Sequence, residues 1–190
     1  MTAVALFHSA LGVRPGVVDA ADRLRSAGHE VTVVDQYDGR TFEGYEEAGA
    51  FVEEVGFPTL MAKAVERVAD LDAGFVVMGF SNGAGMAEHV ATQRPVASAI
   101  LVAGALPLDM LGVDAWPRGI AVQLHATVGD PMRDPAWVDA VMSAIEEAGA
   151  PVEAFDYEGT GHLFTDPSLP DEFDPAATEL LYERVLRFLG

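Results

Sequence analysis

The sequence contains no cysteine and has few basic residues. Its 190 residues include 11 lysine and arginine residues against 30 aspartate and glutamate residues. The absence of cysteine excludes disulfide bonds, thiolate nucleophiles and cysteine-ligated metals. The formal net charge of −19 disfavours binding to phosphate backbones and to anionic lipid. We therefore expect neither nucleic acid nor membrane among the partners of this protein.

Long apolar runs and cofactor motifs are also missing. No apolar stretch approaches the length of a membrane span. The apolar N-terminal segment 1–12 has no basic residues before it, so it is typical of a strand rather than a signal peptide. We expect a cytoplasmic protein. No histidine and carboxylate cluster has metal-ligand spacing, and no G-x-G-x-x-G follows the first expected strand, so we expect no metal and no cofactor.

Short β-type runs alternate with amphipathic segments along the chain. Half of the residues are hydrophobic, which suits one α/β domain over 1–190 with a single core. The alternation predicts a mostly parallel sheet of about six strands, covered by helices on both faces. Strands are expected at 3–8, 30–35, 74–80, 97–105, 119–128 and 151–157. Helices are expected at 14–29, 58–71, directly after Ser81, at 134–149 and at 174–190.

A serine flanked by glycines stands where the third strand meets a helix. The pentapeptide Gly79-Phe80-Ser81-Asn82-Gly83 fits G-x-S-x-G, in which a sharp turn exposes the serine hydroxyl at the carboxyl end of a strand. Glycine at positions 79 and 83 removes Cβ atoms that would clash across such a turn. Taken alone, the motif also fits a serine that caps a helix.

The order of residues along the chain supports a nucleophile. A serine hydroxyl needs a base and an acid that orients it, and in this fold they follow in the order nucleophile, acid, histidine. His162 follows the last strand in a glycine-rich loop, and Asp130 follows the fifth strand. Asp109, after the fourth strand, is the alternative acid. A surface histidine and a turn aspartate are the simpler interpretations of His162 and Asp130.

Other polar and aromatic residues have candidate roles. We expect His8 and His125 to be structural. Arg40 and Arg133 are candidates for contact with a polar end of the substrate, or for solvated surface. The segment from Tyr37 to Phe57 is expected to cover the site. Its aromatic residues are candidates for pocket walls or for ordinary core packing: Phe42, Tyr45, Phe51 and Phe57.

Four stretches together resemble the dienelactone hydrolase family, within the α/β-hydrolases. They are FHSALGVRPG, GFSNGAG, HATVGDP and GTGHLF, and the likeness covers nearly the whole chain. The resemblance implies that Ser81 is the nucleophile, His162 the general base and then acid, and Asp130 the orienting carboxylate. It also implies an oxyanion hole formed by the backbone N–H groups of Asn82 and Ala10.

The chain departs from that family at several positions. The enzymes that give the family its name use a cysteine nucleophile, and Ser81 stands here instead. Ser9 replaces a glutamate that gates the thiol, and Asp166 stands where an arginine holds the substrate carboxylate. Because Asp166 would repel an anionic lactone, a neutral substrate is expected. The candidate substrate-binding residues are Ser9, Phe42, Tyr45, Phe164 and Asp166.

These features predict a serine hydrolase that cleaves a small neutral ester or lactone through an acyl-enzyme, with a Ser-His-Asp triad. A serine thioesterase or lipase-like acyl hydrolase is an alternative that only the shape of the pocket separates. A non-catalytic ligand-binding relative is a third possibility, and it predicts that one triad member is displaced. We expect a small-molecule substrate and a monomeric protein.

Overall fold

The computed structural model describes residues 1–190 and contains one six-stranded parallel sheet. The strand order is β2-β1-β3-β4-β5-β6, and every neighbouring pair is parallel. The α/β class, the mostly parallel sheet and the six strands predicted from the sequence are confirmed. The strands are β1 (Ala3–Phe7), β2 (Glu30–Val34), β3 (Val76–Phe80), β4 (Ser98–Val102), β5 (Ala121–Thr127) and β6 (Val152–Tyr157).

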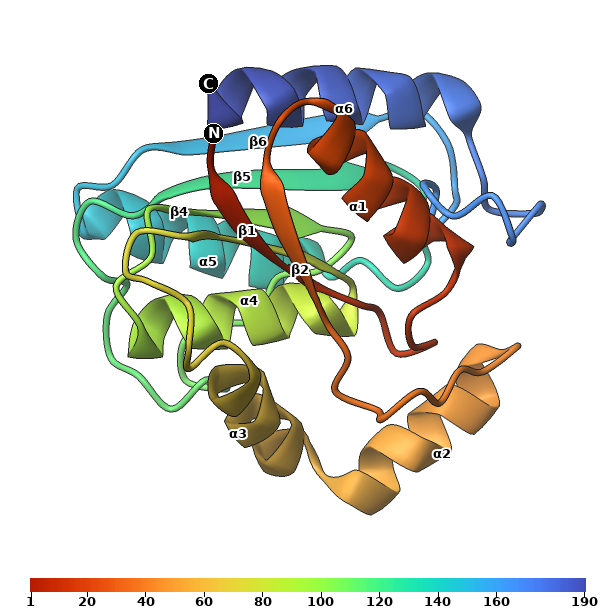
Figure 1. Cartoon of the computed structure of the whole chain (residues 1–190), viewed down its shortest axis with the longest axis horizontal. Coiled ribbons are helices and arrows are strands. Elements are labelled where there is room, and N and C mark those ends of the chain that lie inside the picture. The colour runs from red at the N-terminus through yellow and green to blue at the C-terminus, as the bar shows by residue number, and fades with distance from the viewer.

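The chain forms six helices around this sheet. They are α1 (Pro15–Ser26), α2 (Tyr45–Val55), α3 (Phe57–Arg67), α4 (Asn82–Gln93), α5 (Pro135–Glu147) and α6 (Pro175–Leu189). Figure 1 shows α1 and α6 on one side of the sheet and α3, α4 and α5 on the other. The side chains of β3 divide accordingly: Val77 packs with the α3–α5 layer and Met78 with the α1–α6 layer. No helix is both long and apolar enough to cross a membrane.

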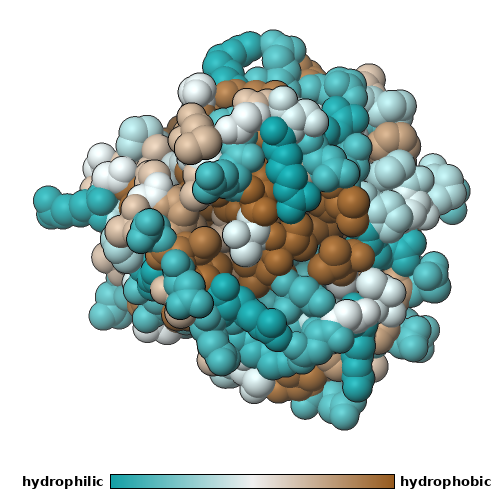
Figure 2. All heavy atoms as spheres, in the orientation of Figure 1, coloured by the Kyte–Doolittle hydropathy of each residue, from teal (hydrophilic) through white to brown (hydrophobic).

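One face of the molecule carries mostly polar residues around an apolar centre (Figure 2). Figure 2 shows a mostly hydrophilic face, with an apolar region near its middle where β2 crosses it. Because β2 is an edge strand, Val31 and Val33 are only partly buried.

The expected strands are somewhat longer than the observed ones. The largest difference is at β4, which ends at Val102 rather than at position 105. Ala103 has a positive φ of 53°, which turns the chain out of the sheet. The bend brings Gly104 against the backbone of Ser81, where a Cβ would meet the Ser81 carbonyl oxygen at 2.6 Å. The chain that leaves β4 therefore passes directly beside the candidate nucleophile.

The strand order reverses between β1 and β3, and this point sets the location of the site. The connection after β1 leads outward to β2, whereas the connection after β3 leads to β4 on the other side. In open parallel sheets, ligands bind at the carboxyl ends of strands beside such a reversal. Ser81 directly follows β3, and Ala10 lies in the connection that follows β1.

Candidate active site

Ser81 occupies a strained turn between β3 and α4. Its backbone has φ 51° and ψ −117°, an unfavourable conformation for a residue with a side chain. Glycine is required on both sides of this turn, because a Cβ on Gly79 would overlap the backbone of Gly83. A Cβ on Gly83 would in turn come within 2.5 Å of the Phe7 carbonyl oxygen. These glycines let the start of α4 pack against the end of β1.

A continuous hydrogen-bonded chain joins Ser81, His162 and Asp130. His162 Nε2 lies 2.7 Å from Ser81 Oγ, and His162 Nδ1 lies 2.7 Å from Asp130 Oδ2. Asp130 is itself held by the Met132 backbone N–H, which donates to Oδ1 at 2.8 Å. His162 and Asp130 are both buried, while Ser81 is partly exposed. This arrangement suits a neutral imidazole that donates from Nδ1 and accepts the serine hydroxyl proton at Nε2.

The structure distinguishes between the two acids considered from the sequence. Asp109 is exposed, and its Oδ1 accepts a hydrogen bond from the Met110 backbone N–H. It makes no hydrogen bond with His162, whereas Asp130 does. Asp134 accepts a hydrogen bond from the Ala136 backbone N–H and caps α5.

The two backbone N–H groups expected to form the oxyanion hole have no acceptor within the protein. Asn82 is the first residue of α4, and Ala10 lies in the β1–α1 connection; the backbone N–H of neither makes a hydrogen bond. The side chain of Asn82 is fixed separately, because its Nδ2 donates to the Tyr37 hydroxyl at 3.1 Å. Burial raises the pKa of Tyr37 to about 12, which keeps this hydroxyl protonated. The two free donors are the kind of group that stabilises an oxyanion.

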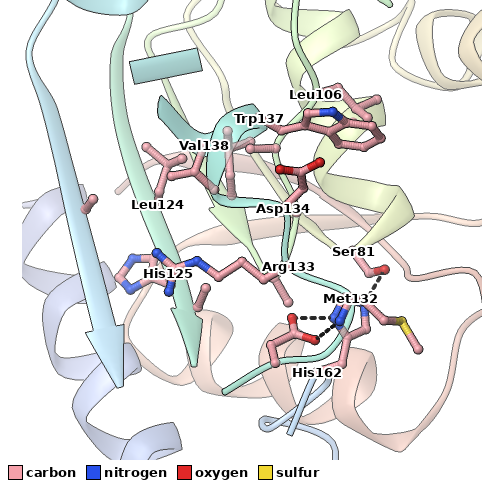
Figure 3. A pocket seen from close by; sticks show the side chains of 18 of the residues that line it. Ser81, Leu106, Leu124, His125, Met132, Arg133, Asp134, Trp137, Val138 and His162 are labelled. Atoms are coloured by element: carbon pink, nitrogen blue, oxygen red, sulfur yellow. Dashed lines mark hydrogen bonds and ion pairs between the residues drawn. The ribbon is translucent and has the colours of Figure 1, made fainter. Parts of the chain in front are cut away.

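A cavity of about 280 Å³ opens beside the serine. It lies between the ends of β4 and β5, the loop after β4 and helix α5, and includes Ser81, Asp130 and His162 in its lining (Figure 3). Of its 22 lining residues 12 are hydrophobic, which makes it suitable for an apolar group. The larger apolar side chains in the wall are Phe57, Leu101, Leu106, Leu124, Met132, Trp137, Val138 and Phe155.

The charged residues in this lining are mostly acidic. Asp130, Asp134 and Asp156 are accompanied by one cation, Arg133. Arg133 Nη1 is paired with Asp156 Oδ1 at 2.8 Å, so its positive charge is already partly neutralised. An anionic substrate would meet more negative than positive charge here.

The two histidines expected to be structural are buried and hydrogen-bonded. His8 Nδ1 lies 2.7 Å from the Ser9 carbonyl oxygen, and its Nε2 accepts the backbone N–H of Gln36. His125 Nδ1 lies 2.8 Å from the Tyr157 hydroxyl. Burial lowers the pKa of both imidazoles, and that of His125 falls to about 3, with nearby Arg184 as a secondary cause. His125 contributes to the cavity lining but makes no hydrogen bond with a triad residue.

All five residues expected to bind substrate lie outside the cavity lining and are held in other contacts. Ser9 is buried, and its Oγ accepts the backbone N–H of Leu11. Phe164 is fully buried against Tyr157. Phe42 packs edge-on against Tyr37, and its backbone carbonyl oxygen accepts a hydrogen bond from Arg14. Phe51 belongs to the same aromatic group, whereas Phe57 does line the cavity.

Asp166 differs most from the expectation. It was expected to face an incoming substrate, but its carboxylate is buried and held by contacts within the protein. Its Oδ1 accepts hydrogen bonds from the backbone N–H of Gly16 at 3.1 Å and from the Ser168 backbone N–H at 2.9 Å. The Arg14 guanidinium lies 3.8 Å from Oδ2. The idea that Asp166 repels an anionic substrate at the mouth of the site is therefore wrong, because the residue does not line the cavity.

Tyr45 lies beside the triad and does not line the cavity. Its ring meets the His162 ring edge-on, with 5.9 Å between centroids. Its hydroxyl lies 2.9 Å from both carboxylate oxygens of Glu172, and Glu172 Oε2 accepts the backbone N–H of Leu163. Glu172 thus connects α2 to the residue that follows His162. Sequence reasoning missed Glu172, because nothing in its local sequence distinguishes it from other surface acids.

The fold, the strained serine and its hydrogen-bonded histidine define the α/β-hydrolase class. The family model of the dienelactone hydrolase family matches residues 1–190, and the chain belongs to this family. This match confirms the resemblance found in the sequence, and it supports the prediction that the protein is a hydrolase. No curated protein matches the chain by sequence. No group of three or more histidine, aspartate or glutamate side chains could hold a metal ion.

Several solved structures share this fold. A dienelactone hydrolase-like promiscuous phosphotriesterase from metagenomic libraries is 17% identical with a TM-score of 0.82, over 99% of this chain and 85% of the other. The α/β-hydrolase domain-containing protein 10 from mouse is 13% identical with a TM-score of 0.71, over 99% and 90%. The Bacillus cereus carboxylesterase is 20% identical with a TM-score of 0.60, over 96% and 86%. At these identities the likeness concerns the fold.

Proposed function

We propose that this protein is a serine hydrolase that cleaves a small neutral ester or lactone through an acyl-enzyme. One observation carries the proposal. The chain of hydrogen bonds from Asp130 through His162 to Ser81 ends at a hydroxyl on a strained turn beside a cavity, and the free backbone N–H of Asn82 follows directly in the chain. A helix-capping serine needs none of these features.

The first half of the reaction forms the acyl-enzyme. Ser81 Oγ attacks the carbonyl carbon while its proton passes to His162 Nε2, and Asp130 stabilises the imidazolium that forms. The carbonyl oxygen becomes an oxyanion that accepts hydrogen bonds from the N–H groups of Asn82 and Ala10. Removal of one such donor in comparable enzymes costs about 3 to 4 kcal/mol of barrier. Collapse of the intermediate breaks the ester C–O bond, and the leaving alcohol takes the proton from Nε2.

The second half returns the enzyme to its starting state. A water molecule gives a proton to His162 Nε2 and attacks the acyl carbon, with the same two donors holding the oxyanion. Ser81 then leaves as the hydroxyl, taking the proton back from the imidazolium, and the carboxylic acid is released. For a lactone, the leaving alcohol stays attached to the acyl group, so the product is a hydroxy acid.

The cavity supports a neutral substrate with an apolar portion. Most lining side chains are hydrophobic, and three carboxylates outnumber the single paired guanidinium of Arg133. The excess negative charge of the whole protein acts in the same direction over a Debye length. A matched substrate with a free carboxylate is therefore expected to have a lower kcat/KM than its neutral analogue.

Labelling with a fluorophosphonate probe tests the nucleophile directly. Wild type should react at Ser81, identified by mass spectrometry of the labelled peptide, and Ser81→Ala should not react. Ser81→Ala should also lower the hydrolysis of p-nitrophenyl acetate by at least about a thousandfold, the scale seen when a catalytic serine is removed. Circular dichroism serves as the control for folding. Near wild-type turnover by folded Ser81→Ala would overturn the proposal.

A panel of esters, thioesters and lactones then separates the chemical alternatives. Hydrolysis of thioesters with a higher kcat/KM than that of matched oxygen esters would favour the thioesterase alternative. A folded wild-type protein that reacts neither with the probe nor with any substrate of the panel would favour a ligand-binding protein.

A further inference from the structure

Three residues of the cavity lining lie close together around the Cα of Gly85. Gly85 on α4, Leu106 in the loop after β4, and Phe57 at the start of α3 all belong to the lining. A Cβ at position 85 would lie 3.1 Å from Leu106 Cγ and 3.5 Å from Phe57 Cζ. The missing side chain of Gly85 therefore creates the space in which the Leu106 side chain lies. In Figure 3, Leu106 and Trp137 are drawn at one end of the cavity residues and His162 at the other.

The backbone of Leu106 is held by a buried acid on the same helix. Glu88 lies three residues after Gly85 on α4 and is completely buried. Its Oε2 accepts the Leu106 backbone N–H at 2.8 Å, and its Oε1 has no hydrogen-bond partner. Burial raises the pKa of the Glu88 carboxyl well above its usual range, which favours the neutral acid.

A buried carboxyl group with one unpaired oxygen reduces the stability of the protein. A buried polar atom without a partner lowers the stability of the protein, and an apolar side chain at position 88 would avoid that loss. The one bond it makes goes to Leu106, a residue of the cavity lining. Buried polar groups that lower stability in this way are found mainly at functional sites.

We propose that Leu106 determines specificity by limiting the length of the apolar substrate chain in the cavity, and that Gly85 and Glu88 are the residues that position it. The inference rests on the proposed function, because it requires the substrate to occupy this cavity. Two independent contacts fix the wall: the side chain of Leu106 fits against Gly85, and its backbone is bonded to Glu88.

Chain-length profiles test the proposal with variants that act in opposite directions. The kcat/KM is measured for p-nitrophenyl esters from acetate to decanoate, and for acetate esters of alcohols of the same lengths. Leu106→Ala should raise the ratio for octyl over butyl chains at least about tenfold in one of the two series, since one methylene in an apolar pocket changes kcat/KM about 10- to 200-fold. Gly85→Ala should lower that ratio, because the new methyl group displaces Leu106 into the cavity.

Two variants at position 88 separate positioning from general stability. Glu88→Gln keeps an oxygen acceptor for the Leu106 N–H and should retain the wild-type profile. Glu88→Leu removes the acceptor and should flatten the profile, with KM changing more than kcat. Leu180→Ala, on the exposed side of α6, is the control and should leave the profile unchanged. Melting temperatures show which variants fold. If Glu88→Leu does not fold, the variants at positions 85 and 106 still decide whether Leu106 limits the chain length.

The outcomes separate this inference from the proposed function. If Leu106→Ala and Gly85→Ala hydrolyse acetate and react with the fluorophosphonate but keep the wild-type profile in both series, the role of Leu106 is overturned and the serine hydrolase remains. If those two variants shift the profile and Glu88→Gln shifts it as strongly as Glu88→Leu, the role of Glu88 is overturned. A wild type that neither reacts with the probe nor hydrolyses any ester overturns both.

Discussion

Asp166 and Gly16 are joined by a hydrogen bond in which the Gly16 backbone N–H donates to Asp166 Oδ1 at 3.1 Å. The two residues are 150 positions apart, and they connect two segments of the candidate site. Gly16 lies at the start of α1, just after the connection that carries Ala10, and Asp166 lies in the loop that carries His162. The proposed oxyanion donor and the proposed base are therefore on segments that are bonded to each other.

The hydrogen bond between Gly16 and Asp166 predicts that removal of the Asp166 carboxylate lowers both stability and turnover. Asp166→Ala leaves the N–H groups of Gly16 and Ser168 without an acceptor, and each buried unsatisfied donor costs about 1–3 kcal/mol. We expect a lower free energy of unfolding in urea and a reduced kcat on p-nitrophenyl acetate. Asp166→Asn keeps Oδ1 and is the matched control, with smaller losses. Equal stability of Asp166→Ala and wild type would contradict the structural role of this carboxylate.

The proposed base predicts an acidic limb in the rate profile. Only a neutral imidazole accepts a proton from Ser81, so protonation of His162 should reduce activity as the pH falls. The measurement is kcat/KM for a neutral ester between pH 5 and 8, with circular dichroism at each pH to confirm that the protein is folded. Wild type should lose activity toward pH 5. A flat profile over this range in the folded protein would count against His162 as the base.

The sheet and the turn at Ser81 could be predicted because they depend on local sequence patterns. The strands alternate with helices along the chain, and β3 and the part of β4 after Ser98 are apolar. The turn at Ser81 needs glycine on both sides, and both glycines stand within two residues of it. Asp130 and His162 follow from strand order, since the carboxyl ends of parallel strands lie at one edge of the sheet.

The cavity and its supporting contacts could not be predicted, because they depend on how distant segments meet. Trp137 and Leu106 belong to segments far apart in the sequence, and only the packing of α5 and the loop after β4 brings both into one cavity. Asp166 illustrates the same limit. Its position after the histidine suggested a contact with substrate, but the approach of α1 gives its carboxylate a buried partner instead.

The hydrogen bond between Tyr45 and Glu172 predicts that substitution of Tyr45 affects mainly stability, whereas substitution of Glu172 also affects kcat. Tyr45→Phe keeps the ring against His162 but loses one hydroxyl donor, so the expected loss is about 0.5–1.5 kcal/mol of stability with kcat nearly unchanged. Glu172→Ala also leaves the Leu163 N–H without its acceptor, next to His162, and should lower kcat and the rate of fluorophosphonate labelling. Glu172→Gln keeps an oxygen acceptor and serves as the control. If all three variants had the same kcat as wild type, Glu172 would have no role in holding His162.

The buried imidazole of His125 predicts that the protein loses stability in acid. Burial, with a smaller effect of Arg184, lowers its pKa in the folded state to about 3, below the ordinary value of 6.5 expected in the unfolded chain. Between these two values the unfolded chain binds the proton and the folded protein does not, so the free energy of unfolding decreases as the pH falls through this range. From pH 7 to pH 5 the expected contribution is about 2 kcal/mol.

His125→Gln tests this contribution, because a glutamine does not titrate and can still form hydrogen bonds with Tyr157 or Gln123. Urea unfolding of both proteins at pH 7, 6 and 5 gives the free energy of unfolding at each pH. The variant should lose less stability than wild type on acidification, by about 2 kcal/mol at pH 5, whatever its stability at pH 7. His8, whose pKa is also lowered by burial, remains in both proteins and contributes equally to both. Parallel pH dependences in the two proteins would show that His125 takes up its proton equally in the folded and unfolded states, against the burial seen in the structure.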